Sequence, residues 1–185
     1  MRRSLCALAG VAVLLAACSD SESSEPDVTT VATTVAPAAD EPTGTQTFTD
    51  LEQTHVDTAV EYAQTPPVGG PHSPAWQNCG FYDVEFPAER GVHSMEHGAV
   101  WITYSADLPA ADVAVLKGFA DNGEEVLVSP FTGLPAQVVA SAWGKQLVPE
   151  GVNDPLLAEF VAFFDDGPQT PEMNTPCSQG TSDTD

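Results

Sequence analysis

The stretch Thr65 to Pro74 limits the fold more than any other part of this chain, because proline and glycine fill most of it. Proline lacks the backbone N–H that a helix interior or a central strand needs, and glycine weakens both elements. We therefore expect a fixed, irregular loop here. Loops of this kind carry binding residues on a rigid scaffold, and His72 lies in the middle of this one.

A histidine-rich stretch, His93-Ser94-Met95-Glu96-His97-Gly98, directly precedes the apolar run of residues 99–104. If it is extended, His93, Met95 and His97 share one face, since strand side chains alternate. If it is helical, His93 and His97 stay together one turn apart and Met95 moves away. Both conformations bring the two histidines together, so the stretch predicts a metal site.

All four histidines fall within residues 55–97. Neutral imidazole is a common ligand for zinc, copper, nickel and iron, and several rings must converge on one ion. We expect His72, His93 and His97 to bind a metal, with the thioether of Met95 as a fourth, soft ligand. Soft sulfur beside imidazole favours copper(I), whereas histidine with carboxylate alone favours zinc or copper(II).

Structural roles compete for some of these residues. Met95 can fill the core, and His55 can be an ordinary polar residue. Glu96 and Tyr62 are expected to hydrogen-bond to the metal ligands and orient them, although Glu96 can also be a solvated side chain.

The first residues predict export. Met1-Arg2-Arg3 is basic, and the apolar run of residues 5–17 is shorter than the about 20 residues of a membrane-spanning helix. Leu15-Ala16-Ala17-Cys18 resembles the lipobox of bacterial lipoproteins, which implies removal of residues 1–17 and acylation of Cys18. We expect a lipid anchor at the outer face of the cytoplasmic membrane, with ordinary signal cleavage as the alternative.

Composition divides the mature chain. Residues 18–47 are rich in Ser, Thr, Pro and acidic residues and contain no aromatic residue, so we expect a disordered tether. Residues 48–177 suffice for one globular domain, and residues 178–185 are expected to be a disordered tail. Without the signal, three basic side chains face 27 acidic ones, a formal charge of −24. Such a surface excludes nucleic-acid binding and favours cations.

Cys79 and Cys177 remain as a possible disulfide, because Cys6 leaves with the signal and Cys18 is acylated. A bond between them would tie the C-terminal part of the chain to the histidine region. It would stabilise the fold by about 4–5 kcal/mol in the chain-entropy model. Two thiols that help to bind a metal are the alternative.

Apolar runs predict strands at residues 99–104, 125–129 and 137–143. Capping signals at Asp107-Leu108-Pro109 and Asn153-Asp154-Pro155 predict two helices, which end near Gly123 and Gly167. This order predicts a small α+β domain with an antiparallel or mixed sheet covered by two helices. It is similar to the element order of thioredoxin-like folds, although there is no Cys-x-x-Cys.

Residues between 62 and 104 resemble the signature of a bacterial family of exported or membrane-anchored proteins, described only as a domain of unknown function. The matching residues are Tyr62, Pro66, Pro67, Gly70, His72, Trp76, Gly80, Tyr82, Val92 to Gly98, and Tyr104. The resemblance extends over about residues 50–175 and supports His72, His93 and His97 as the site. In that family the position of Met95 is often leucine, which fits burial better than metal binding.

Three functions remain open. The first is a surface lipoprotein that binds a metal ion or transfers it to a partner, with copper favoured over zinc. The second is a zinc hydrolase that uses His72, His93 and His97 with Glu96 as base. The third is a structural or adhesive module in which the histidines only form hydrogen bonds. The sequence has no Gly-x-Ser-x-Gly, His-Glu-x-x-His or phosphate-binding glycine loop, so we favour the first and assign no catalytic residue.

Overall fold

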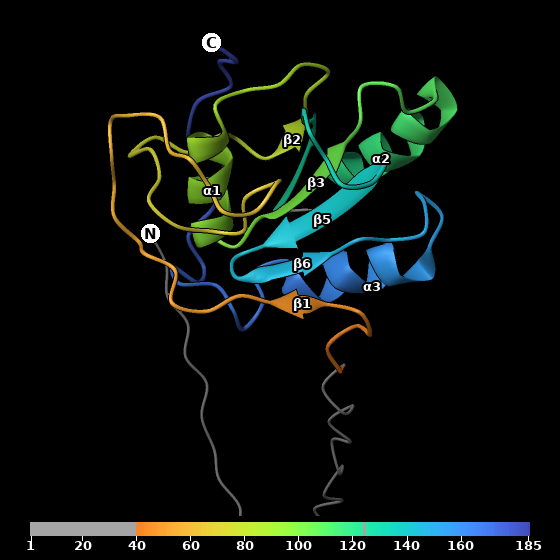
Figure 1. Cartoon of the computed structure of the whole chain (residues 1–185), viewed down its shortest axis with the longest axis horizontal. Helices are drawn as coiled ribbons and strands as arrows, with labels where there is room; N and C mark the ends of the chain where they lie inside the picture. The colour runs from red at the N-terminus through yellow and green to blue at the C-terminus, as the bar shows by residue number, and fades with distance from the viewer. Residues whose placement is uncertain (1–39, 124) are drawn as a thin grey trace, which may run out of the picture. The chain divides into compact units, whose positions relative to one another are not determined.

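A computed structural model describes residues 40–123 and 125–185. They form a mixed six-stranded sheet, with strand order β1-β6-β5-β3-β4-β2, and three helices (Figure 1). The strands are β1 (Gln46–Thr47), β2 (Gly80–Phe81), β3 (Val100–Tyr104), β4 (Val126–Pro130), β5 (Val138–Ala142) and β6 (Lys145–Leu147). The helices are α1 (Ala88–Glu96), α2 (Ala110–Asn122) and α3 (Pro155–Phe164).

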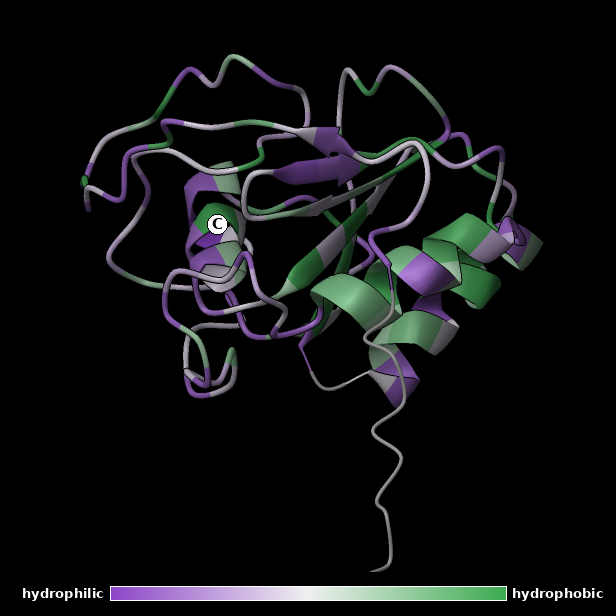
Figure 2. Cartoon of the chain, turned by 90° about the horizontal axis from the view of Figure 1, so that it is seen from below, coloured by the Kyte–Doolittle hydropathy of each residue, from purple (hydrophilic) through white to green (hydrophobic). Residues whose placement is uncertain are grey.

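The sheet carries helices on both faces, and the residues of β3 show how. Val100, Ile102 and Tyr104 belong to the core under α2 and α3, whereas Trp101 belongs to a second core under α1. Successive strand residues point to opposite faces, and because both faces are covered, all five β3 residues are buried. Figure 2 shows α2 and α3 as largely apolar helices on the same side of the sheet.

The predicted α+β class is confirmed, and the sheet is mixed. β3 and β4 run parallel and α2 connects them, while β5 pairs antiparallel with β3. Both predicted helices are present. Helix α2 begins directly after Pro109. The Asp154 carboxylate caps α3 by accepting from Leu156 N at 3.0 Å. The described residues contain three helices rather than two, and the thioredoxin-like order is not confirmed.

The additional helix is α1, in the stretch that carries His93 and His97. It begins after Pro87, with Glu89 in its first turn, and ends before Gly98. Gly98 has a φ of 119°, and a Cβ there would lie 3.0 Å from the Asp166 backbone, so the turn out of the helix needs glycine. The histidine stretch is therefore helical, which is the second of the two conformations that the sequence allows.

Both ends of the domain are longer than the sequence predicts. Gln46 and Thr47, assigned to the tether, form β1 and pair with β6. Residues 178–185, expected to be disordered, contact the segment before β2 and helix α1: Asn78 N donates to Thr181 O at 2.8 Å, and Arg90 of α1 donates to Asp183 O at 3.0 Å. The predicted signal peptide, Cys18 and the tether up to residue 39 lie outside the described residues. No helix in the described part could span a bilayer.

Two helical glycines give a matched test of the packing around α1. A Cβ on Gly91 would lie 2.6 Å from the Trp101 ring, whereas a Cβ on Gly118 in α2 meets nothing within 4 Å. We expect Gly91→Ala to lower the free energy of unfolding by about 1–3 kcal/mol through overpacking. Gly118→Ala should raise it by about 0.4–1 kcal/mol, since alanine favours helix. Urea denaturation of both variants checks this, and equal effects would contradict the close packing of α1 on Trp101.

Candidate metal centre

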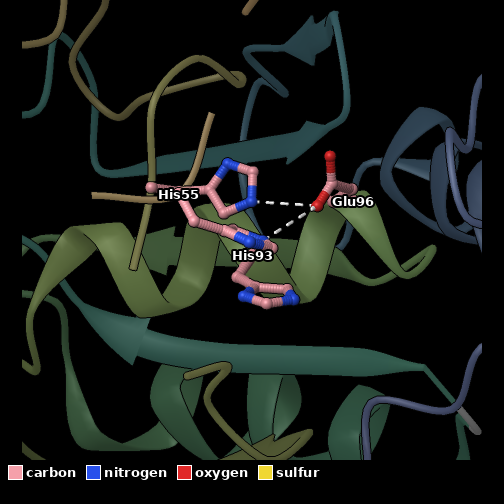
Figure 3. A group of neighbouring side chains, drawn as sticks. His55, His93 and Glu96 are labelled. Atoms are coloured by element: carbon pink, nitrogen blue, oxygen red, sulfur yellow. Dashed lines mark ion pairs between the residues drawn. The ribbon is translucent and has the colours of Figure 1, made fainter. Parts of the chain in front are cut away.

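Three segments bring four possible ligands together. His55 precedes the irregular stretch of residues 65–74, which we call the Pro-Gly loop. His72 lies within this loop, and His93 and Glu96 come from α1. One ligand atom from each of these four residues lies within 4.8 Å of all the others (Figure 3). We call this group the histidine–glutamate cluster. Three imidazoles and a carboxylate are a donor set that could hold a metal ion.

Backbone hydrogen bonds hold the first two ligands side by side. Val56 N donates to His72 O at 2.7 Å, and His72 N donates to Thr54 O at 3.0 Å. His55 and His72 thus form an isolated parallel bridge although 17 positions separate them. The contact fixes the backbone of both residues, while the His55 side chain stays 49% exposed.

Tight packing shapes the loop that carries His72. Gly69 has a φ of 140°, and a Cβ there would lie 2.8 Å from Leu51 and 3.2 Å from the Trp143 ring. The Trp143 ring in turn packs edge-on against His72. Tyr62 donates its hydroxyl hydrogen to Pro71 O at 2.8 Å, so it supports the loop rather than an imidazole. Burial, with a smaller effect of the Glu89 carboxylate, raises the pKa of Tyr62, which keeps this donor protonated.

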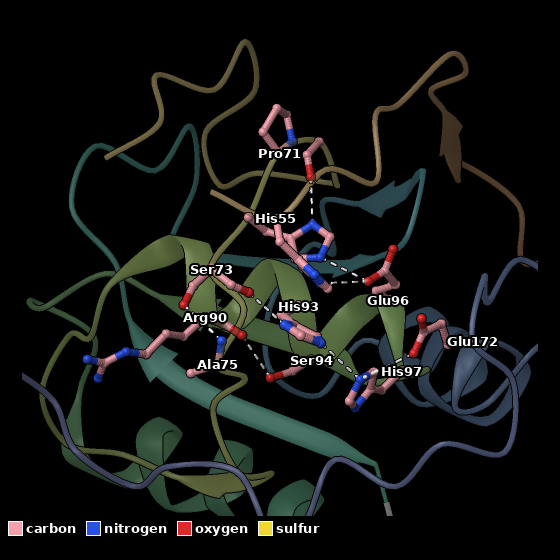
Figure 4. Close-up of polar contacts among 12 residues, drawn as sticks. His55, Pro71, Ser73, Ala75, Arg90, His93, Ser94, Glu96, His97 and Glu172 are labelled. Atoms are coloured by element: carbon pink, nitrogen blue, oxygen red, sulfur yellow. Dashed lines mark hydrogen bonds and ion pairs between the residues drawn. The ribbon is translucent and has the colours of Figure 1, made fainter. Parts of the chain in front are cut away.

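Two carbonyl oxygens determine where the buried imidazoles carry their protons. His72 Nδ1 lies 2.8 Å from Gly70 O. His93 Nδ1 lies 2.6 Å from Ser73 O, as Figure 4 shows. A carbonyl oxygen only accepts, so Nδ1 of each ring must carry the hydrogen. In the neutral ring Nε2 then holds a free lone pair. Metal-ligating histidines in proteins are oriented in this way.

The Nε2 atom of His72 lacks a hydrogen-bond partner among the described residues. It is buried, yet it lies 2.9 Å from Glu96 Oε2. With the His72 hydrogen on Nδ1, this contact joins two acceptors, which repel each other unless a proton or a metal ion lies between them. Burial raises the pKa of Glu96, and the neighbouring His72 partly offsets this effect.

His97 lies next to the cluster rather than in it. Its Nε2 is 3.0 Å from His93 Nε2 and 3.6 Å from Glu172 Oε2, and its Nδ1 is 3.3 Å from Pro176 O. Of the three predicted histidine ligands, the structure therefore brings His72 and His93 into one group and places His97 one contact further out. Trp76 packs against the rings of both His93 and His97.

The structure reassigns two of the other candidates and adds one. Met95 is completely buried in the core with Val92 and Trp101, because the helix turns it away from the histidines. Glu96, expected to orient a ligand rather than bind the metal, points into the group as a possible ligand (Figure 3). His55 joins it, a point that the sequence left open; its place among the four clustered histidines was the signal for it.

The cysteines form a separate group. Cys79 and Cys177 are joined in a disulfide, as predicted, so their sulfurs are not thiolate ligands. Glu125 lies beside them and accepts from Cys177 N at 2.7 Å. The disulfide fixes the segment that supplies Pro176 O and Glu172 to His97.

Electrostatics keep the α1 histidines uncharged at neutral pH. Burial, with smaller effects of His97, His72 and His55, lowers the pKa of His93 to about 4, although its hydrogen bond to Ser73 opposes the shift. Burial also lowers the pKa of His97. A neutral imidazole is the form that binds a metal, so protons compete weakly for these nitrogens.

The protonation of His93 gives a testable prediction for the metal-free protein. Long-range ¹H–¹⁵N spectra should show the Nδ1–H tautomer and a titration midpoint near pH 4, against about 6.5 in the urea-unfolded chain. Because the unfolded chain takes up this proton first, the free energy of unfolding should fall as the pH falls from 6.5 to 4. His93→Gln should lose less stability over that range. Titration near pH 6.5 in the folded protein would contradict the assigned burial.

One of three comparisons with known proteins gave a match, and it covers most of the described domain. A search of curated proteins found no match, and a search of solved structures found none either. A family model described as "Protein of unknown function (DUF3105)" matches residues 54–179, which include the four histidines, Glu96 and both cysteines of the disulfide. Since this stretch is more than half of the sequence, the chain belongs to that family of unknown function.

Proposed function

We propose that this protein binds one transition-metal ion through the histidine–glutamate cluster and acts in metal binding or handling rather than catalysis. One observation carries the proposal: the buried Nε2 of His72 has no hydrogen bond among the described residues and faces a carboxylate oxygen at 2.9 Å. A buried lone pair beside a buried carboxylate destabilises a site with no cation. A metal ion between them would bind the His72 nitrogen and the Glu96 oxygen at once.

The donor set favours copper(II), with zinc as the alternative. The sequence favoured copper(I) because the thioether of Met95 is a soft ligand. Met95 lies in the core, however, so no thioether is available among the residues of the cluster. Imidazole suits copper and zinc alike, and nitrogen and oxygen sites bind copper(II) more tightly than zinc in the usual order of divalent metals. Three imidazoles and one carboxylate suit a four-coordinate ion of either kind.

We further propose that the protein works outside the cytoplasm, anchored through acylated Cys18. Support comes from the apolar run and lipobox-like residues of the sequence and from the disulfide, a bond typical of oxidising compartments. A tether between Cys18 and the domain would leave the cluster free to meet ions beside the membrane. The acidic surface would raise the local concentration of cations.

Metal content tests the binding proposal. We expect the protein, purified without a histidine tag, to bind about one Cu²⁺ per chain, with Zn²⁺ weaker in competition. His72→Gln and His93→Gln should each weaken binding by more than the roughly 10–100-fold that loss of an orienting partner costs. Met95→Leu is the matched control on α1 and should bind as the wild type does. Stoichiometric metal that survives both histidine changes would place the ion elsewhere.

A zinc hydrolase is the second candidate, and Glu96 is the residue that favours it. A carboxylate with a raised pKa suits a general base, and three histidines alone could hold the zinc and its water. A groove with a volume of about 500 Å³ is lined by Val56 and Ser73, the residues that follow His55 and His72, although no residue of the cluster lines it.

Glu96→Gln separates the two functions. If Glu96 is a ligand, the variant should lose metal affinity, and the zinc-loaded wild type should not hydrolyse an activated ester such as p-nitrophenyl acetate above the rate of free zinc. If Glu96 is a base, the variant should retain zinc but lose ester hydrolysis that the wild type shows. The second outcome would overturn the non-catalytic function.

A further inference from the structure

A line of donor atoms leads from the buried cluster to the surface. His93 Nε2 lies 3.0 Å from His97 Nε2, which lies 3.6 Å from Glu172 Oε2 (Figure 4). Exposure rises along the line, from 3% for the His97 side chain to 50% for that of Glu172. We propose that His97 and Glu172 form a route by which the metal ion enters and leaves the histidine–glutamate cluster, an inference that rests on the proposed metal binding.

The spacing suits stepwise ligand exchange. Two atoms that bind the same ion at the usual bond lengths can lie no more than about 4.2 Å apart. Both contacts of His97 satisfy this limit, so an ion can bind His97 before it leaves His93, and Glu172 before it leaves His97. No step requires an ion without protein donors in a buried place, where an unpaired charge is costly.

The surrounding backbone holds this line of donors in place. His97 follows the last residue of α1, one turn after His93, and its Nδ1 faces Pro176 O at 3.3 Å. Glu172 N donates to Glu96 O at 3.0 Å, which fixes Glu172 beside the end of the same helix. Cys177 anchors the segment through its disulfide. The backbone of Glu172 is therefore fixed at the surface end of the route, where half of its side chain is exposed.

His55 offers a competing route, because its side chain is also half exposed. His55 is itself one of the four donors of the cluster, so an ion that leaves past it first loses a ligand. His97 lies outside the group of four and adds a ligand before one is lost. Exchange through His97 therefore avoids the intermediate of lowest coordination, which is why we favour it.

Exchange kinetics of the full chain test the route, with Zn²⁺ as the probe ion. Stopped-flow absorbance would follow loading from a zinc indicator and removal by excess EDTA. We expect Glu172→Gln to slow loading and removal alike, by about tenfold, which corresponds to about 1.4 kcal/mol on the barrier in both directions. The equilibrium affinity for Zn²⁺ should stay the same, since equal changes in the two rates leave their ratio unchanged.

Glu159→Gln is the matched control, because it removes the same charge from an exposed position on α3. It should leave both rates unchanged, which separates the route from a general effect of net charge. Wild-type rates in Glu172→Gln, with one ion still bound, would overturn the route and direct exchange past His55. Faster removal with weaker affinity would make Glu172 a ligand and overturn the route as well. A wild-type chain that binds no ion would instead remove the proposed function itself.

Discussion

The hydrogen bonds from His72 and His93 to the carbonyl oxygens of Gly70 and Ser73 decide what the rest of this site can do. They hold the hydrogens on Nδ1 and turn both Nε2 lone pairs inward, toward Glu96 and His97. Each carbonyl belongs to the Pro-Gly loop, whose shape depends on glycines packed against Leu51, Tyr62 and Trp143. The irregular loop thus sets the protonation of the ligands as well as their positions.

The same electrostatics bear on the proposed metal binding. Burial lowers the pKa of His93 and raises that of Glu96, so both groups favour their uncharged forms. A bound ion would attract the imidazole lone pair and the ionised carboxylate together. Binding of an ion to the folded chain would then add to its stability.

Sequence reasoning succeeded where local signals are strong. The buried strands, the starts of α2 and α3 and the Cys79–Cys177 pair have short-range or compositional causes, and the structure has each of them, although only α3 has a side-chain cap. The loop and the grouping of the histidines also predicted that His72 and His93 come together, and the structure has both in the group of four. The resemblance to a family of unknown function was correct as well.

The remaining features depend on tertiary contacts. Whether residues 93–97 are extended or helical could not be decided from alternating residues, and the helix sends Met95 into the core. His55 joins the cluster only because its backbone pairs with His72 across 17 positions, a contact that no local pattern predicts. The pairing of β1 with β6 and of the last residues with the segment before β2 is equally long-range.

The disulfide also has a consequence for the order of assembly. All four donors of the cluster lie at or before residue 96, whereas Pro176 and its neighbour Cys177 come about 80 residues later. A chain still under synthesis therefore has its ligands before it has the segment that surrounds His97. The contacts around His97 can form only when the last part of the chain has been made, and the disulfide then links that part to Cys79.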